Sequence, residues 1–133
     1  MSTLNPYQKY QKQSVYTLTP GELIILLFDE AIKDIKKSIL YVRTGKTCDS
    51  HNSIIKAQNI FLHLIDSLDM RYPISNQILP LYDFVYNTLI KANIEKSCDK
   101  LQDCLGLATD LKNTWQEAEK LSKVNSRLQE KSI

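Results

Sequence analysis

Four stretches of the chain carry apolar residues at steps of three and four positions, the period of an amphipathic α-helix. The first follows a Thr-Pro-Gly-Glu segment, in which Thr19 can cap a helix, Pro20 suits its first turn and Glu22 can complete a capping box. Its apolar stripe comprises Ile24, Leu27, Phe28, Ala31, Ile35, Ile39 and Val42. The pattern predicts a helix that ends at Gly45.

The second stretch begins near Thr47 or Asp49, either of which can cap a helix, and is apolar on more than one face. The stripe expected to face a core comprises Ile54, Ala57, Phe61, Leu64, Ile65 and Leu68. Ile55, Ile60 and Leu62 are apolar as well, and these additional residues cannot all point in the same direction. The helix expected over 47–70 therefore has more apolar surface than one interface requires.

Two further helices are expected after Pro73, which disfavours helical geometry at the residue before it. The helix expected from Ser75 or Asn76 has an apolar stripe at Ile78, Leu81, Tyr82, Val85, Leu89 and Ala92. The helix expected after Ser97, which can cap it, has a stripe at Leu101, Cys104, Leu105, Ala108, Leu111, Trp115 and Ala118.

Four helices of this length with short connections predict an all-α fold, an antiparallel four-helix bundle over residues 19–122. Residues 1–18 are polar and lack a sustained period, so we expect them to form a mobile N-terminal arm. The apolar period fades from Lys123, and residues 123–133 are expected to be a frayed tail.

Composition and charge narrow the functional class. The 133 residues carry a net charge of only +2, which argues against an electrostatically driven nucleic-acid binder. No apolar run approaches the ~18 residues of a membrane span, so no membrane insertion is expected. The N-terminus lacks a secretory signal, and three cysteines without CxxC spacing indicate reduced thiols in a cytoplasmic protein.

No residue pattern predicts catalysis, a metal centre or a cofactor. Metal sites in four-helix bundles use Glu-x-x-His pairs, whereas Cys48 and Ile60 stand three residues before His51 and His63, the two histidines of the chain. A phosphotransfer bundle that uses His63 is a minor alternative. It is disfavoured because Asp66, three residues later, would repel a phosphoryl group.

The surplus apolar positions point instead to a partner. A helical segment laid into a groove between two bundle helices would cover them. The arm, or a weak homodimer, could cover the same positions, and both stay open at this point.

The chain resembles the flagellin-specific export chaperones of bacterial flagella, the FliS family, in five blocks that occur in order. These blocks are YQKQSV, TLTPGELIILLFDEAI, KAQNIFLHLIDSLD, ILPLYDFVYNTLIKAN and LQDCLGLATDLKNTW. They span about Tyr7 to Trp115. Amphipathic helices imitate one another, so the order of the blocks carries more weight than any single block.

The resemblance implies a cytoplasmic, non-enzymatic helical bundle that binds the disordered C-terminal segment of flagellin. Such binding prevents premature polymerisation and presents the subunit to the flagellar type III export gate. The resemblance also implies an arm that covers part of the binding surface and helps to engage the gate. Tyr7 and Tyr10 occupy the arm positions where that role would fall.

A flagellin segment that cannot fold alone would complete a half-core on this bundle. The residues expected to line its groove are Ile55, Lys56, Ile60 and Leu62, with Ile25 and Tyr86 as weaker candidates. Lys56 would contribute an aliphatic stem and a charge at the groove's edge. A different amphipathic client for the same kind of bundle remains the alternative.

The chain departs from the family pattern at three places. Tyr72-Pro73-Ile74-Ser75 lies where the family usually has a pair of glycines, and His63 replaces an acidic residue. Ser97, which can still cap, replaces the Asp that often opens the last helix. A stiffer connection and a changed charge are expected to alter affinity or partner preference rather than remove the binding surface.

Overall fold

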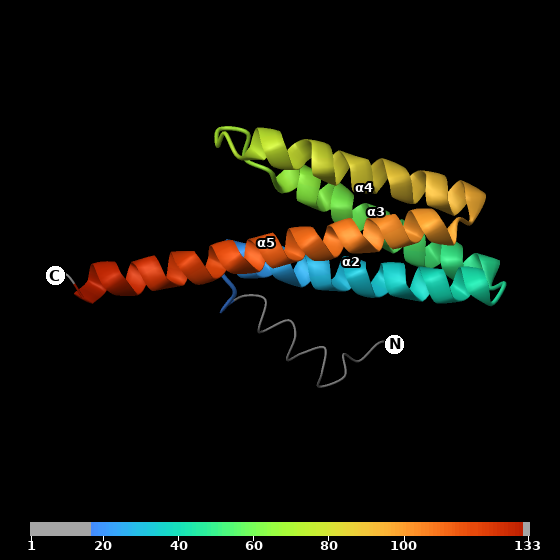
Figure 1. Ribbon diagram of the computed structural model, residues 1–133, viewed down its shortest axis with the longest axis horizontal. Helices are drawn as coiled ribbons and strands as arrows, with labels where there is room; N and C mark the ends of the chain where they lie inside the picture. The colour runs from blue at the N-terminus through green and yellow to red at the C-terminus, as the bar shows by residue number, and fades with distance from the viewer. Residues whose placement is uncertain (1–16, 132–133) are drawn as a thin grey trace, which may run out of the picture.

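The computed structural model describes residues 17–131, and within them it contains helices α2 (Pro20–Arg43), α3 (Thr47–Ser67), α4 (Ser75–Glu95) and α5 (Cys98–Lys131). Each helix runs antiparallel to the next, and the chain returns so that α5 packs beside α2 (Figure 1). The predicted antiparallel four-helix bundle is confirmed. Most of the arm expected over 1–18, including Tyr7 and Tyr10, lies outside the described residues.

The start of α2 is held by the predicted capping box. The Glu22 amide donates to Thr19 Oγ1 at 3.1 Å, and the Thr19 amide donates to Glu22 Oε1 at 3.3 Å. The hydrogen bond from the Thr19 amide is the main cause that lowers the pKa of the Glu22 carboxyl. The Thr19 hydroxyl also donates to Glu119 Oε1 at 2.8 Å, so the same cap ties α2 to α5.

The other helix ends are defined mainly by the backbone. Gly45 has a φ of 72°, a left-handed conformation that glycine adopts without strain, and α2 ends two residues before it. Lys46 precedes α3 without a side-chain cap, so neither Thr47 nor Asp49 has the capping role expected from the sequence. Ser97 does cap α5, because its hydroxyl accepts from the Lys100 amide at 3.2 Å.

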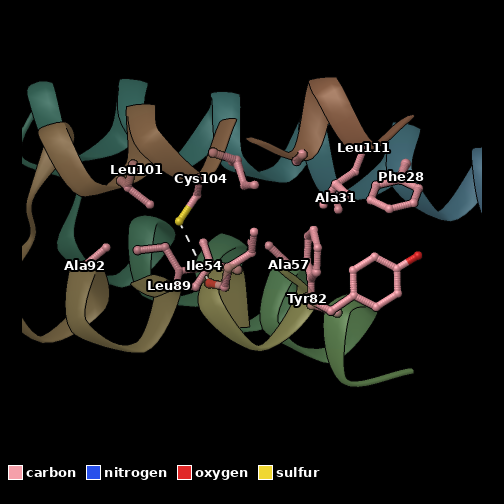
Figure 2. Packing of buried hydrophobic residues seen from close by; sticks show 14 of the residues in the cluster. Phe28, Ala31, Ile54, Ala57, Tyr82, Leu89, Ala92, Leu101, Cys104 and Leu111 are labelled. Atoms are coloured by element: carbon pink, nitrogen blue, oxygen red, sulfur yellow. Dashed lines mark hydrogen bonds between the residues drawn. The ribbon is translucent and has the colours of Figure 1, made fainter. Parts of the chain in front are cut away.

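The core follows most of the stripes expected from the sequence and is organised along the bundle axis (Figure 2). The expectation is wrong for Leu81 and Ala118, which are exposed because they lie at the edges of their stripes. At one end Phe28, Phe61 and Tyr82 form a mutual edge-to-face cluster, with ring centroids 5.9 to 6.1 Å apart. At the middle the Cys104 thiol, buried on α5, donates to the Val85 carbonyl oxygen at 3.8 Å. The aromatic cluster joins α2, α3 and α4, which contribute Phe28, Phe61 and Tyr82, and the Cys104 contact joins α5 to α4.

Helix α5 is longer than the sequence pattern predicted. The apolar period fades at Lys123, yet the helix continues to Lys131. Residues 107–131 contain no glycine or proline, so nothing in the backbone ends the helix when its core stripe ends. The expectation of a frayed tail from residue 123 is therefore wrong as far as Lys131. Residues 121–131, which we call the overhang, project past the start of α2 (Figure 1).

The aromatic cluster predicts a large difference between two phenylalanines. Phe61→Ala should lower the free energy of unfolding by about 3 to 5 kcal/mol, because it leaves a cavity in the fully buried cluster. Phe84 is 54% exposed, so Phe84→Ala should cost less than about 1 kcal/mol. Urea unfolding followed by circular dichroism measures both, and equal losses would contradict the assigned core.

Candidate functional site

The outer side of the α3–α4 pair carries a broad apolar surface. His51 Nδ1 on α3 lies 3.0 Å from Asn93 Nδ2 on α4, which marks the sides on which these helices meet. Ile55 and Leu62 follow His51 by four and eleven residues and so stay on its side of α3. Tyr86 precedes Asn93 by seven residues and stays on its side of α4. The structure thus brings three of the candidates, Ile55, Leu62 and Tyr86, onto one surface.

Further apolar residues that the sequence reasoning did not assign to a binding site enlarge this surface. Helical spacing places Ile65 on the same side of α3, and Leu79 and Ile90 on the same side of α4. We call the six residues the outer α3–α4 surface: Ile55, Leu62, Ile65, Leu79, Tyr86 and Ile90. Leu62 is 42% exposed and the other five are half-buried. Ile65 and Tyr86 also pack against the core, and all six residues keep part of their surface exposed.

Lys56 and Ile60 lie on the other side of α3, which faces α2. Ser53 Oγ is 2.7 Å from Ser38 Oγ on α2, and Lys56 and Ile60 follow Ser53 by three and seven residues. Ile60 is half-buried and packs against the core, whereas Lys56 is exposed. The four candidates on α3 are therefore divided between two sides of the helix.

A buried carboxyl, that of Asp34 on α2, lies near the charge of Lys56 on the side of α3 that faces α2. Asp34 on α2 is 9% exposed, and this burial raises its pKa. The positive charge of Lys56 acts in the opposite direction and favours the ionised carboxylate. Lys56 thus contributes to a charge balance within the α2–α3 interface as well as to the exposed surface.

Ile25 lies at a third place, in a cleft of about 420 Å³ between the start of α2 and α5. Leu26 lines the same cleft, and so does Leu18, the last residue of the segment expected to form the arm. Charged residues from α5, among them Lys120, form the opposite wall. Helix α2 also contributes Glu22 and Asp29 to the lining, so the cleft combines a few apolar side chains with charges from both helices.

A second cleft, of about 400 Å³, lies at the end of the bundle beside the connection between α3 and α4. Trp115 Nε1 donates to Tyr82 Oη at 2.9 Å inside it, and burial raises the pKa of Tyr82 to about 12. Tyr72 and Ile74 belong to its lining and are 61% and 56% exposed. The apolar residues of this connection are the signal in the sequence, which predicts a helix break and a stiffer connection there but not a cleft.

The described residues hold no cluster suited to metal chemistry. Within residues 17–131 no three His, Cys, Asp or Glu side chains lie close enough together to hold a metal ion. His63, the residue of the phosphotransfer alternative, is exposed, and so is Asp66. No helix in the same range is long and apolar enough to cross a membrane.

Four helices around one core, with an apolar outer surface left over, define an all-α bundle of the kind that packs against other polypeptides. The family model described as flagellar protein FliS matches residues 3–122. The chain therefore belongs to the FliS family, a family of flagellar secretion chaperones.

Individual relatives agree with this assignment. The flagellar secretion chaperone FliS of Bacillus subtilis (strain 168) is 33% identical over 118 residues, which cover 89% of each chain. That of Salmonella typhimurium (strain LT2) is 25% identical over 109 residues, which cover 80% of this chain and 81% of the relative. A crystal structure of a bacterial flagellar chaperone has the same fold. Its TM-score is 0.72 at 18% identity, covering 86% of this chain and 94% of the other.

The raised pKa of Tyr82 predicts a loss of stability in alkali. An unfolded tyrosine ionises near pH 10, whereas the buried one stays neutral until about pH 12. Between these values the unfolded state binds fewer protons, so the free energy of unfolding should fall as the pH rises, by up to about 2 kcal/mol for this group.

Urea unfolding at a series of pH values between 9 and 12 measures this slope. Tyr82→Phe should make the slope shallower but not remove it, because burial raises the pKa of the Cys104 thiol to about 12 as well. The variant also loses the Trp115 hydrogen bond at every pH. Tyr72→Phe, at a residue 61% exposed, is the matched control and should leave the slope unchanged. An unchanged slope in Tyr82→Phe would show that Tyr82 ionises alike in both states.

Proposed function

We propose that this chain is a cytoplasmic, non-enzymatic export chaperone that binds the disordered C-terminal segment of flagellin. Binding delays polymerisation and aids delivery of the subunit to the flagellar type III export gate. Membership of a family of flagellar secretion chaperones supports this proposal. The structural observation that carries it is the outer α3–α4 surface, whose six apolar residues are partly exposed on two neighbouring helices, with Gln58 as a polar residue within the α3 line.

The physical argument starts from the client. A disordered segment remains unfolded because it cannot bury enough apolar surface on its own. An amphipathic client helix laid along α3 and α4 would cover Leu62 and the outer atoms of Ile55 and Tyr86, and would bury its own apolar side in return. Part of the interaction free energy is lost in ordering the client, which keeps the complex releasable.

The remaining candidates fit a client that contacts more than one side of the bundle. We propose the cleft at Ile25 as a second contact region, and the edge formed by Lys56 and Ile60 as a third. Because these regions lie on different sides, an extended segment would have to pass around the helices to reach all of them. Tyr7 and Tyr10 remain proposed contacts of the arm with an export gate component.

The position of the outer α3–α4 surface predicts that Leu62 contributes to binding of the flagellin segment. Leu62→Asp should weaken binding of the flagellin C-terminal segment at least about tenfold, a cost of about 1.4 kcal/mol or more, because it places a carboxylate in the apolar contact. Fluorescence anisotropy with a labelled segment measures the dissociation constant. Circular dichroism should show an unchanged fold, since Leu62 is 42% exposed.

The matched control is Leu81→Asp, because Leu81 is 41% exposed but lies on the α5 side of α4. It precedes Glu95 by fourteen residues, and Glu95 pairs with Lys100 on α5 at 2.7 Å. Equal effects of the two variants would contradict the α3–α4 assignment. A wild-type chain that does not bind the flagellin segment would overturn the proposed function in favour of another amphipathic client.

A further inference from the structure

The outward side of α5 changes from polar to apolar where the helix extends past the other helices. One line of exposed residues runs along it at steps of three and four: Asp103, Gly106, Asp110, Asn113, Glu117, Leu121, Val124 and Leu128. The first five are polar or glycine and lie beside the bundle. Leu121, Val124 and Leu128 belong to the overhang and are 62%, 49% and 60% exposed. The apolar stripe therefore begins only where the bundle ends.

The inward side of α5, which faces the other helices, changes from apolar to polar at the same place. Leu111 and Trp115 face the other helices, but the positions that continue their line into the overhang are Ser122 and Ser126. The apolar side of α5 thus turns by roughly half a helical turn at the end of the bundle. An overhang built this way cannot extend the chain's own core, and its apolar stripe faces away from that core.

Basic residues border one side of the stripe. By helical spacing, Lys120 and Arg127 flank Leu121, Val124 and Leu128 on one side, while the other side carries uncharged residues such as Asn125. Lys120 and Arg127 form no ion pair with any residue of 17–131, whereas Lys123 lies 3.7 Å from the Glu22 carboxylate. Two cations thus remain available to a partner that covers the stripe.

A second copy of this chain does not match these charges. If two overhangs packed antiparallel, Lys120 of one copy would face Arg127 of the other, since flanking positions of the same kind meet in that arrangement. If the two overhangs packed parallel, the outward sides of the two α5 helices would also face each other beside the bundles. Asp110 and Glu117 of one copy would then lie opposite the same residues of the other copy. Both arrangements place like charges opposite one another, which disfavours association.

We propose that the overhang docks an acidic amphipathic helix of a different protein. The apolar side of that helix covers Leu121, Val124 and Leu128, and its carboxylates pair with Lys120 and Arg127. Three apolar residues bury little area, so the contact is weak and transient. The site lies outside the outer α3–α4 surface and does not require the proposed client.

A pair of labelled synthetic peptides tests the proposal with the full chain at low ionic strength. One is a helical peptide with leucines at steps of three and four flanked by glutamates; its twin has lysines in place of the glutamates. Anisotropy titrations should show binding of the acidic peptide and not of its twin. Charge reversal by Lys120→Glu with Arg127→Glu should reverse this preference.

The apolar contact is tested by Leu121→Asp with Leu128→Asp, which should weaken binding of the acidic peptide at least about tenfold. The matched control is Leu40→Asp on α2, because Leu40 is 59% exposed and lies outside α5. This control should bind as the wild type does. Circular dichroism should confirm that every variant keeps its helices, since all altered residues are exposed.

Several results would overturn the proposal. Equal binding of both peptides, or wild-type binding by the overhang variants, would show that the stripe is not the docking site. Sedimentation that shows self-association lost in Leu121→Asp would assign the stripe to a second copy. Vesicles of phosphatidylglycerol that bind the wild type but not this variant would assign it to a membrane. Titration of the flagellin segment into the variant with Leu121→Asp and Leu128→Asp should give the wild-type affinity, so the two proposals fail separately.

Discussion

An α-helix turns only one stripe of side chains toward a bundle core, and this constraint determines where the outer surface of this protein is apolar. The stripes of α2, α3, α4 and α5 close around Phe28, Phe61 and Tyr82 at one end and around Cys104 further along (Figure 2). Apolar residues at the edges of these stripes or outside them are only partly covered by the bundle. Among them are the outer α3–α4 surface and the stripe on the overhang, where we propose that two different partners bind.

Helical periodicity and end signals were sufficient to predict the bundle. The capping residues Thr19 and Glu22 and the core stripes appear in the structure as expected, because both depend on short-range spacing. The arrangement of the candidate site was harder to predict, since Ile55 and Ile60 lie on opposite sides of α3 and only the positions of α2 and α4 show which partner each side meets. The length of α5 was missed because a helix without glycine or proline outlasts its core contacts.

The architecture separates stability from binding. The aromatic cluster is fully buried, so the bundle can keep its fold while the proposed client associates and leaves. The outer α3–α4 surface is mostly half-buried, which limits the apolar area exposed by the free chaperone and the area gained on binding. The overhang adds a separate surface with its own charge pattern, so a client and a second partner could be held together.

Calorimetric titration of the chain with the C-terminal segment of flagellin, repeated at several temperatures, tests the central claim most directly. The account predicts a one-to-one complex with a large negative heat-capacity change, because the client folds as it buries apolar surface on the bundle. No heat at any temperature, together with no change in the anisotropy of a labelled segment, would contradict the account and leave only the fold and the family assignment.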